Sequence, residues 1–208
     1  EIRGAGNLLG AEQSGQIGAV GFDLYTRLLA DAVEGLKALA RGEEPPPSKM
    51  QPPITIDVPL TAFIPESYIG DINLRLALYQ RMAAAEGAGA AADLERELTD
   101  RFGPPPAPVR NLLYVVHLRA LAKRAGVIAI AREEAPSGQP VLTVRAVQGE
   151  DFRARVAPSR RRDLERDGIA TIGHNQMRIN LDAAGDGWRE LLARMLEAAA
   201  REPEAVAV

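Results

Sequence analysis

The first 21 residues constrain this chain most, because glycine recurs there at short intervals: Gly4, Gly6, Gly10, Gly15, Gly18 and Gly21. Glycine loses more conformational freedom on folding than any other residue, so this density disfavours both helix and strand. Polar side chains alternate with the glycines, namely Arg3, Glu12, Gln13 and Ser14. The segment is therefore predicted to be a shaped loop that holds polar groups on tight backbone turns.

Composition limits the possible classes of protein. A length of 208 residues predicts one or two domains, and 46% hydrophobic residues suffice for a core. The absence of cysteine excludes disulfides and thiolate metal sites and fits a reducing cytoplasm, where we expect the protein to reside. Neither His117 nor His174 has a set of potential metal ligands around it in the sequence, so no metal site is expected. No apolar run is long enough to span a membrane, so no membrane association is expected.

A net charge of -3 is unusual for a free-standing domain that binds duplex DNA, since such domains are usually basic. Any DNA contact is therefore predicted to be local and near the N-terminus.

A proline-rich linker divides the chain. Leucines and other apolar residues recur at helical spacing from Leu24 to Leu39, and Gly42 is a plausible stop. Three consecutive prolines follow at 45–47, and proline lacks the amide donor that regular structure needs. We predict two domains, 1–47 and 48–208.

The second domain mixes helices and strands. Alternation and helical spacing predict strands at 54–58, 127–130, 141–147, 169–172 and 177–181, with helices at about 71–85, 90–102, 107–125 and 187–200. Asp71 is the expected N-cap of the first of these helices. Residues 151–167 are ambiguous, because Pro158 interrupts a charged stretch. The predicted fold class is α+β, a small and mostly antiparallel sheet packed with several helices, preceded by the glycine-rich loop and its helix.

Two blocks resemble a known family. From Arg3 the chain reads RGAGNLLGAEQSG and from Val20 VGFDLYTRLL, which is similar to the translocation motif of bacterial transcription-repair coupling factor and of the related translocase RecG. Residues 64–106 contain IPESYI, RLALYQR and ELTDRFGPPP, which resemble the C-terminal domain of the coupling factor and not RecG. The resemblance covers roughly residues 1–130.

The resemblance implies a parent protein that is an ATP-dependent translocase on double-stranded DNA. Such a protein dislodges stalled RNA polymerase and recruits nucleotide excision repair through UvrA. This chain begins at Glu1 within the motif and lacks a G-x-x-x-x-G-K-[ST] phosphate loop, so we interpret it as a C-terminal fragment, most simply monomeric, without enzymatic activity of its own. No catalytic residue and no cofactor are expected in it; ATP and magnesium belong to the parent.

In the first block, Arg3 and Gln13 match the polar positions of the translocation motif. The resemblance implies that they couple ATP hydrolysis to movement along DNA, with Glu12 and Ser14 completing an exchangeable hydrogen-bond network. The alternative is a glycine-rich connector whose polar residues only cap turns.

In the second block, Glu97 and Asp100 share one helix edge with Asp93. In the family, the C-terminal domain clamps the N-terminal module that recruits UvrA, which implies that these acids form an intramolecular, autoinhibitory contact. The alternative is an ordinary solvated helix face. Arg101 is expected to brace Asp100 or the helix end.

The run Arg160–Arg162 could touch nucleic acid, but Asp163, Glu165 and Asp167 follow it and weaken its field, so no site is assigned there. Two other functions stay open for the chain as a whole. One is the end of a RecG-like helicase acting on branched DNA, and the other is a plain protein-interaction domain.

Overall fold

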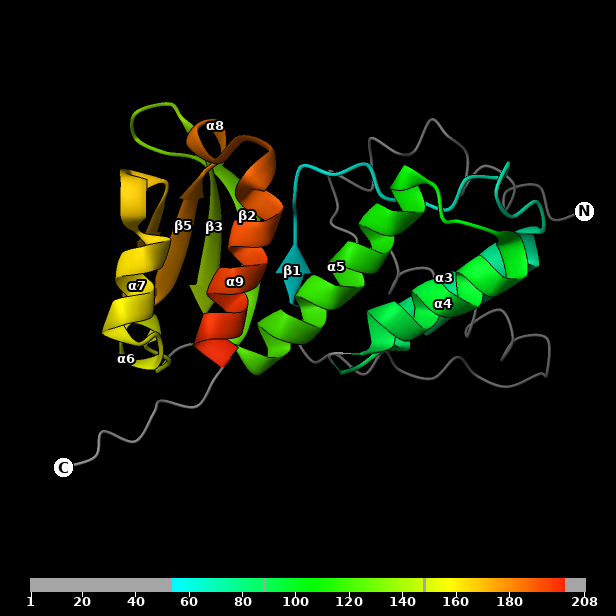
Figure 1. Ribbon diagram of the computed structural model, residues 1–208, viewed down its shortest axis with the longest axis horizontal. Coiled ribbons are helices and arrows are strands. Elements are labelled where there is room, and N and C mark those ends of the chain that lie inside the picture. The colour runs from blue at the N-terminus through cyan, green and yellow to red at the C-terminus, as the bar shows by residue number, and fades with distance from the viewer. Residues whose placement is uncertain (1–53, 88, 148, 201–208) are drawn as a thin grey trace, which may run out of the picture. The chain divides into compact units, whose positions relative to one another are not determined.

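The computed structural model describes residues 54–87, 89–147 and 149–200, and Figure 1 shows their course. These residues belong to two compact units. The first contains 59–117, and the second contains 54–58 together with 118–200. The predicted segment 1–47 and the predicted boundary near residue 48 lie outside the described residues.

The first unit consists of a loop followed by helices α3 (Ile72–Ala84), α4 (Ala90–Phe102) and the first part of α5 (Ala107–Arg124). Asp71 caps α3 as predicted, because its Oδ1 accepts hydrogen bonds from the amides of Asn73 at 2.8 Å and Leu74 at 3.3 Å. The core of the unit is aliphatic; its most deeply buried side chains include Leu78, Met82, Leu98, Val109 and Leu112.

The second unit contains a five-stranded sheet in the order β1-β2-β3-β5-β4. Its strands are β1 (Thr55–Ile56), β2 (Val127–Glu134), β3 (Pro140–Ala146), β4 (Ala170–Ile172) and β5 (Gln176–Asn180). Only the β1–β2 pair is parallel, so the predicted mostly antiparallel α+β fold is confirmed. Strand β2 runs four residues beyond the predicted end, because Arg132 and its neighbours pair with the full length of β3.

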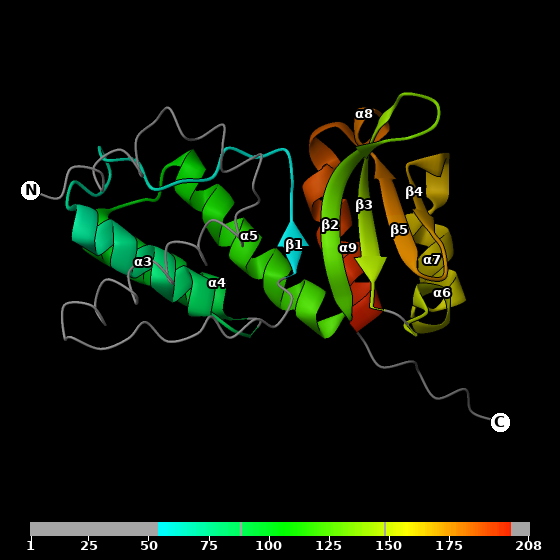
Figure 2. The ribbon, with the colours of Figure 1, turned by 180° about the vertical axis from the view of Figure 1, so that it is seen from behind.

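The ambiguous stretch 151–167 forms two short helices, α6 (Phe152–Arg155) and α7 (Pro158–Leu164). Pro158 begins α7 rather than breaking a longer helix, since the first helical position needs no amide donor. The last helices of the described residues are α8 (Leu181–Ala184) and α9 (Trp188–Ala200). Figures 1 and 2, taken from opposite sides, show α6, α7 and α9 on one face of the sheet, with strands β2, β3 and β5 in the foreground of Figure 2.

Burial alternates along β4 and β5, as the pleat of a strand requires, whereas β3 buries side chains on both faces at residues 141–144. Leu142 lies opposite Ile179, and Val144 lies opposite Met177, and all four side chains are fully buried. Arg145, next along β3, is exposed on the other face. The helices therefore cover an aliphatic face, which agrees with the low aromatic content.

Candidate protein-interaction site

Two side chains of helix α3, those of Tyr79 and Arg75, hold the loop at residues 64–70 against the helix. The hydroxyl oxygen of buried Tyr79 accepts a hydrogen bond from the amide of Ile64 at 2.8 Å. Arg75 is only 6% exposed, and its Nη1 donates to the carbonyl oxygens of Ile69 at 2.7 Å and Gly70 at 3.1 Å. The guanidinium group of Arg75 is thus a charged hydrogen-bond donor to two loop carbonyls, of which that of Ile69 belongs to a buried residue.

The same loop also reaches the end of helix α4. The hydroxyl group of Tyr68 donates to the carbonyl oxygen of Gly103 at 2.8 Å and lies 3.2 Å from that of Leu98. Its ring meets the ring of Phe102 edge-on, with centroids 6.0 Å apart. Tyr68 therefore satisfies the carbonyl of Gly103, the C-cap residue of α4, which has no intrahelical partner.

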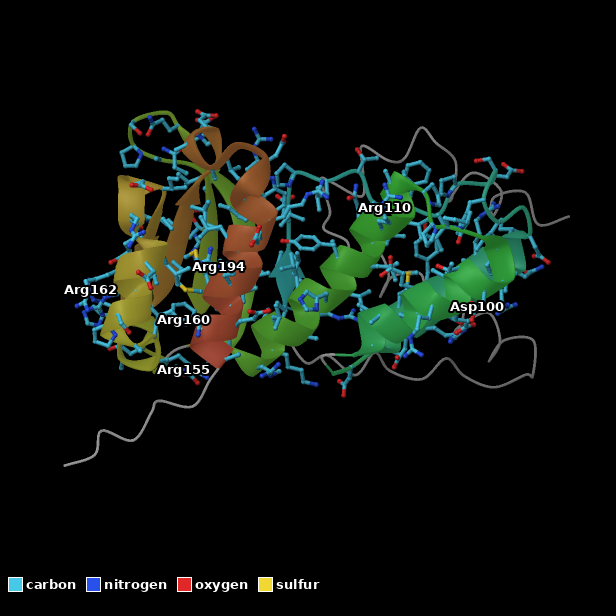
Figure 3. The ribbon with its side chains drawn as sticks, viewed as in Figure 1. Asp100, Arg110, Arg155, Arg160, Arg162 and Arg194 are labelled. Atoms are coloured by element: carbon cyan, nitrogen blue, oxygen red, sulfur yellow. The ribbon has the colours of Figure 1, made fainter. Side chains whose placement is uncertain are left out.

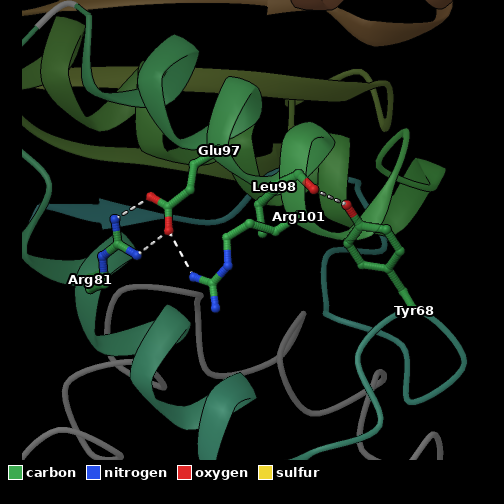
Figure 4. A network of polar contacts seen from close by, with 5 residues as sticks. All are labelled: Tyr68, Arg81, Glu97, Leu98 and Arg101. Atoms are coloured by element: carbon green, nitrogen blue, oxygen red, sulfur yellow. Dashed lines mark hydrogen bonds and ion pairs between the residues drawn. The ribbon is translucent and has the colours of Figure 1, made fainter.

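Glu97 is the centre of a charged network on α4, shown in Figure 4. Arg81 of α3 binds its carboxylate with both terminal nitrogens, at 2.7 and 2.5 Å. Arg101, one turn further along α4, donates to the same carboxylate at 3.0 Å. Arg101 thus reaches Glu97 rather than Asp100, and its guanidinium also lies 5.0 Å from the centre of the Phe102 ring.

These contacts change the acidity of Glu97. Hydrogen bonds first from Arg81 and then from Arg101 stabilise the charged form, and they lower the pKa of Glu97 from 4.5 to about 2. The side chain of Glu97 is 31% exposed, and those of Arg81 and Arg101 are 51% and 47% exposed. The network is therefore fully ionised at neutral pH but remains open to solvent, so competing ions can reach it.

The two other predicted acids differ from Glu97. Asp93 forms an exposed ion pair with Arg96 on its own helix. Asp100 is exposed on α4 (Figure 3) and has no hydrogen-bond or ion-pair partner in the part of the chain that the structure describes. All three lie on the same side of the buried row formed by Leu94 and Leu98. Among the described residues, the helix therefore presents the carboxylate of Asp100 without a partner, that of Asp93 in an exposed pair and that of Glu97 held by two arginines.

The other predicted site residues, Arg3, Glu12, Gln13 and Ser14, lie outside the described residues. Sequence reasoning missed the roles of Arg75 and Arg81. The signal for Arg75 is its place on the buried stripe of α3, four residues after the N-cap, where a solvated arginine is not expected. No comparable signal exists for Arg81, because its partner is sixteen residues away on another helix.

Histidine and acidic residues do not gather into a metal centre. Within residues 54–87, 89–147 and 149–200, no group of three or more potential ligands occurs. His174 is exposed and lies 2.9 Å from the carboxylate of Asp151, which also caps α6. In the same ranges, no helix has both the length and the apolar character that a membrane crossing requires.

Comparisons with known proteins agree on one family. The model of the TRCF domain matches residues 58–147. The transcription-repair-coupling factor of Haemophilus influenzae is 47% identical over 131 residues, or 62% of this chain and 11% of that protein. Its counterpart in Mycobacterium tuberculosis is 38% identical over 171 residues, 76% of this chain and 14% of that protein.

A solved structure supports the fold. The crystal structure of the C-terminal domain of transcription-repair coupling factor matches with a TM-score of 0.53 at 18% identity, over 70% of this chain and 89% of that one. The aligned part of this chain spans only 11% and 14% of the lengths of the two curated relatives. Together, the family model, the relatives and the fold show that this chain belongs to the transcription-repair coupling factor family and contains its C-terminal region.

Proposed function

We propose that this chain is the C-terminal part of an ATP-dependent double-stranded DNA translocase that displaces stalled RNA polymerase and recruits excision repair. The proposal is supported by its family and by the small share of each relative that it spans. ATP and magnesium act in the parent, upstream of the chain, in a cytoplasmic protein. A RecG-like end is less well supported, since the matched relatives carry the coupling-factor name.

Within that parent, the acidic edge of α4 serves as an autoinhibitory contact for the N-terminal module that recruits UvrA. The single observation that carries this proposal is Asp100, an exposed carboxylate with no partner among the described residues, on the edge shared with Asp93 and Glu97. A basic patch on the module would complete it. Exposed ion pairs each contribute little binding free energy and are screened by salt. Such pairs suit a contact that has to be released during the working cycle of the parent.

The test is calorimetric titration of the full chain with the isolated N-terminal module of the parent, at low and at moderate salt. Asp100→Arg removes a charge that no described residue engages, and it is expected to weaken binding at least about tenfold. Glu95→Arg makes the same charge change on the opposite side of the Leu94 and Leu98 row, and is the matched control. Equal losses in both variants would reject a specific contact at this edge, as would binding that does not respond to salt.

Residues 1–47 carry the second part of the proposal, the coupling of ATP hydrolysis to movement. Its support is the resemblance of the Arg3–Gly15 segment to the translocation motif. In the parent, Arg3→Ala is expected to leave ATP hydrolysis measurable and to abolish displacement of a DNA triplex strand. Normal triplex displacement by this variant would reject the coupling role.

A further inference from the structure

Two large hydrophobic side chains are exposed at one end of the sheet. Among the residues that the structure describes, these are Ile128, which is 46% exposed, and Val147, which is 44% exposed. Ile128 lies near the start of β2, and Val147 directly follows β3. The amide of Val147 donates to the carbonyl oxygen of Gly126 at 2.8 Å, so the two strands remain paired up to this point. Both side chains therefore lie where β2 begins and β3 ends.

A β-bulge turns Ile128 away from the helices of the second unit. The register between β2 and β3 shifts between Val127 and Ala129. Val127 and Ile130 are both buried, although they are three positions apart and a regular strand alternates with a period of two. The bulge thus adds one residue to β2 and re-aims a side chain. As a result, Ile128 lies on the face opposite to that of Val127 and Ile130.

Val147 lies on the same face as Ile128. Its neighbour Ala146 is buried, and the pleat of the strand points the next side chain the other way. Gly126, which pairs with Val147, has no side chain that could cover it. Ile128 comes two residues after Gly126 and is therefore the diagonal neighbour of Val147, a spacing that long side chains can bridge. We call Ile128 and Val147 the apolar pair.

The segment that follows α9 starts at this same end of the sheet. Figures 1 and 2, taken from opposite sides, both show the last turn of α9, in red, beside the start of β2 and the end of β3. Residues 201–208 then read REPEAVAV. Six residues in extended form reach up to about 20 Å. That reach is twice the separation of about 10 Å between packed layers. Val206 is therefore close enough in sequence to α9 to reach the apolar pair around the end of the sheet.

The residue pattern of this segment suits contact with an apolar surface. Val206 and Val208 alternate with alanine, so both valines lie on one side of an extended chain. Pro203 disfavours continuation of α9, because proline has no amide donor, and it favours extended backbone in the residue before it. The segment is thus predicted to offer two branched aliphatic side chains on one face.

Charges at this end of the sheet are complementary to those of the segment. Helix α5 has the exposed cations Lys123 and Arg124 in its last turn, directly before β2 begins. The segment carries two acids, Glu202 and Glu204, and one cation, Arg201, before its valines. Acids followed by valines thus meet cations followed by the apolar pair, and the opposite charges attract each other.

We propose that residues 201–208 dock on the apolar pair and cover Ile128 and Val147. Val206 and Val208 supply the aliphatic contact. Burying two half-exposed side chains gives weak attraction by itself, but the tether to α9 raises the effective concentration of the segment to the millimolar range. The contact is therefore reversible, and its release exposes the apolar pair again. It is separate from the clamp proposed for the acidic edge of α4.

The test is paramagnetic relaxation enhancement measured by NMR on the full chain. The sequence contains no cysteine, so Ala207→Cys creates a single attachment point for a nitroxide label. Position 207 lies between the two valines and points away from their side, so the label leaves the contact free. We expect the label to broaden the amide signals of Ile128 and Val147 most, apart from those of α9 itself, and to spare the hairpin loop at 135–139 at the other end of β2 and β3.

A pair of sheet variants tests whether the apolar pair makes this contact. Ile128→Ser, Val147→Ser is expected to abolish the broadening at this end of the sheet, because it removes the aliphatic surface. The matched control is Thr171→Ser, Arg178→Ser, which changes two exposed positions on β4 and β5 and should retain the broadening. Circular dichroism checks that both labelled variants are folded, which is expected because all four positions are exposed.

Every other outcome would overturn the proposal. Broadening that is spread evenly over the chain, or strongest on another surface, would show that the segment does not dock here. Broadening that persists in Ile128→Ser, Val147→Ser would show that the apolar pair is not its contact. A mixture of nitroxide-labelled chain with separate isotope-labelled chain reveals contacts between molecules. Equal broadening in that mixture would mean that a second copy, and not the chain's own segment, covers the pair.

Discussion

The guanidinium group of Arg75 lies within the first unit and donates to the backbone carbonyl oxygen of Ile69 at 2.7 Å. A second bond from the same nitrogen reaches Gly70 at 3.1 Å. The arginine therefore acts as an internal brace between helix α3 and the loop before it, although its charge suggests a surface role. This brace positions the loop that supplies Tyr68 to the end of α4.

Replacing Arg75 should destabilise the fold strongly. Arg75→Ala leaves two loop carbonyls without their charged donor, and we expect a loss of about 2–3 kcal/mol in the free energy of unfolding. Arg110→Ala is the matched control, because Arg110 also donates to a backbone carbonyl, that of Pro105, at 2.7 Å, but is exposed. Urea unfolding should show a loss of about 1 kcal/mol or less for Arg110→Ala; equal losses would contradict an internal brace.

The hydroxyl group of Tyr68 should matter separately from its ring. Tyr68→Phe keeps the edge-on contact with Phe102 but removes the donor to Gly103 and Leu98. We expect about 1 kcal/mol of destabilisation, and faster amide hydrogen exchange in the last turn of α4 than in α9. Uniform exchange changes in both helices would point to general unfolding rather than to a lost bond at this helix end.

Gly103 should not tolerate a side chain. Its φ of 82° and ψ of -176° lie in a region that is almost exclusive to glycine, while a Cβ there would meet nothing within 4 Å. Gly103→Ala is therefore expected to cost about 1–3 kcal/mol through backbone strain alone. Gly89→Ala, at φ -92° and ψ -14° with open space around it, should stay within about 0.5 kcal/mol of the unmodified chain in thermal unfolding.

Acid should remove the contribution of Glu97. Its pKa is 4.5 in the reference state and about 2 in the fold, so the folded state binds fewer protons between these values. The contribution is thus fully present above 4.5 and is lost as pH falls from 4.5 through about 2. Solvent screening limits it to about 1 kcal/mol.

Comparison with Glu97→Gln isolates this effect. The difference in the free energy of unfolding between the unmodified chain and Glu97→Gln should shrink across that acidic range and remain constant at higher pH. High salt should reduce the difference at neutral pH, because both arginines are about half exposed. A difference that does not vary with pH would show that Glu97 is not held by its arginines in solution.

Arg81 should compete with any basic partner for Glu97. It occupies both carboxylate oxygens at 2.7 and 2.5 Å, so a clamp contact through Glu97 must displace or share it. Arg81→Ala is expected to strengthen binding of the N-terminal module that we propose as the partner severalfold, by about 0.5–1 kcal/mol, despite a small loss of stability. Arg96→Ala is the comparison variant, because it removes the partner of Asp93 instead of the partner of Glu97. Unaltered affinity in Arg81→Ala would mean that Glu97 takes no part in the contact.

Local sequence signals were sufficient for much of the fold. Asp71 predicted the start of α3, because an N-cap acts within its own first turn. The last helix, with Trp188 and Leu192 buried, followed from helical spacing alone. The β-rich runs at 127–130 and 141–147, joined by the hairpin loop at 136–140, likewise predicted antiparallel pairing, which β2 and β3 show. Pro158 was harder to interpret, since proline both ends and begins helices, and only neighbouring structure distinguishes the two cases.

The sequence by itself determined the four longest helices of the described residues, most strands, the α+β class and the family, since these depend on short-range periodicity and on motif residues. Only the tertiary structure decided which charges are compensated. Glu97 is held by Arg81 across sixteen residues, whereas Asp100, three residues away on the same edge, has no partner among the described residues. Glu165 pairs with Arg161 and Asp163 pairs with Arg166, although Arg160 and Arg162 stand beside them in the sequence. The reason is physical: Coulomb attraction and hydrogen bonding depend on distance and direction in space, which the order of residues does not specify.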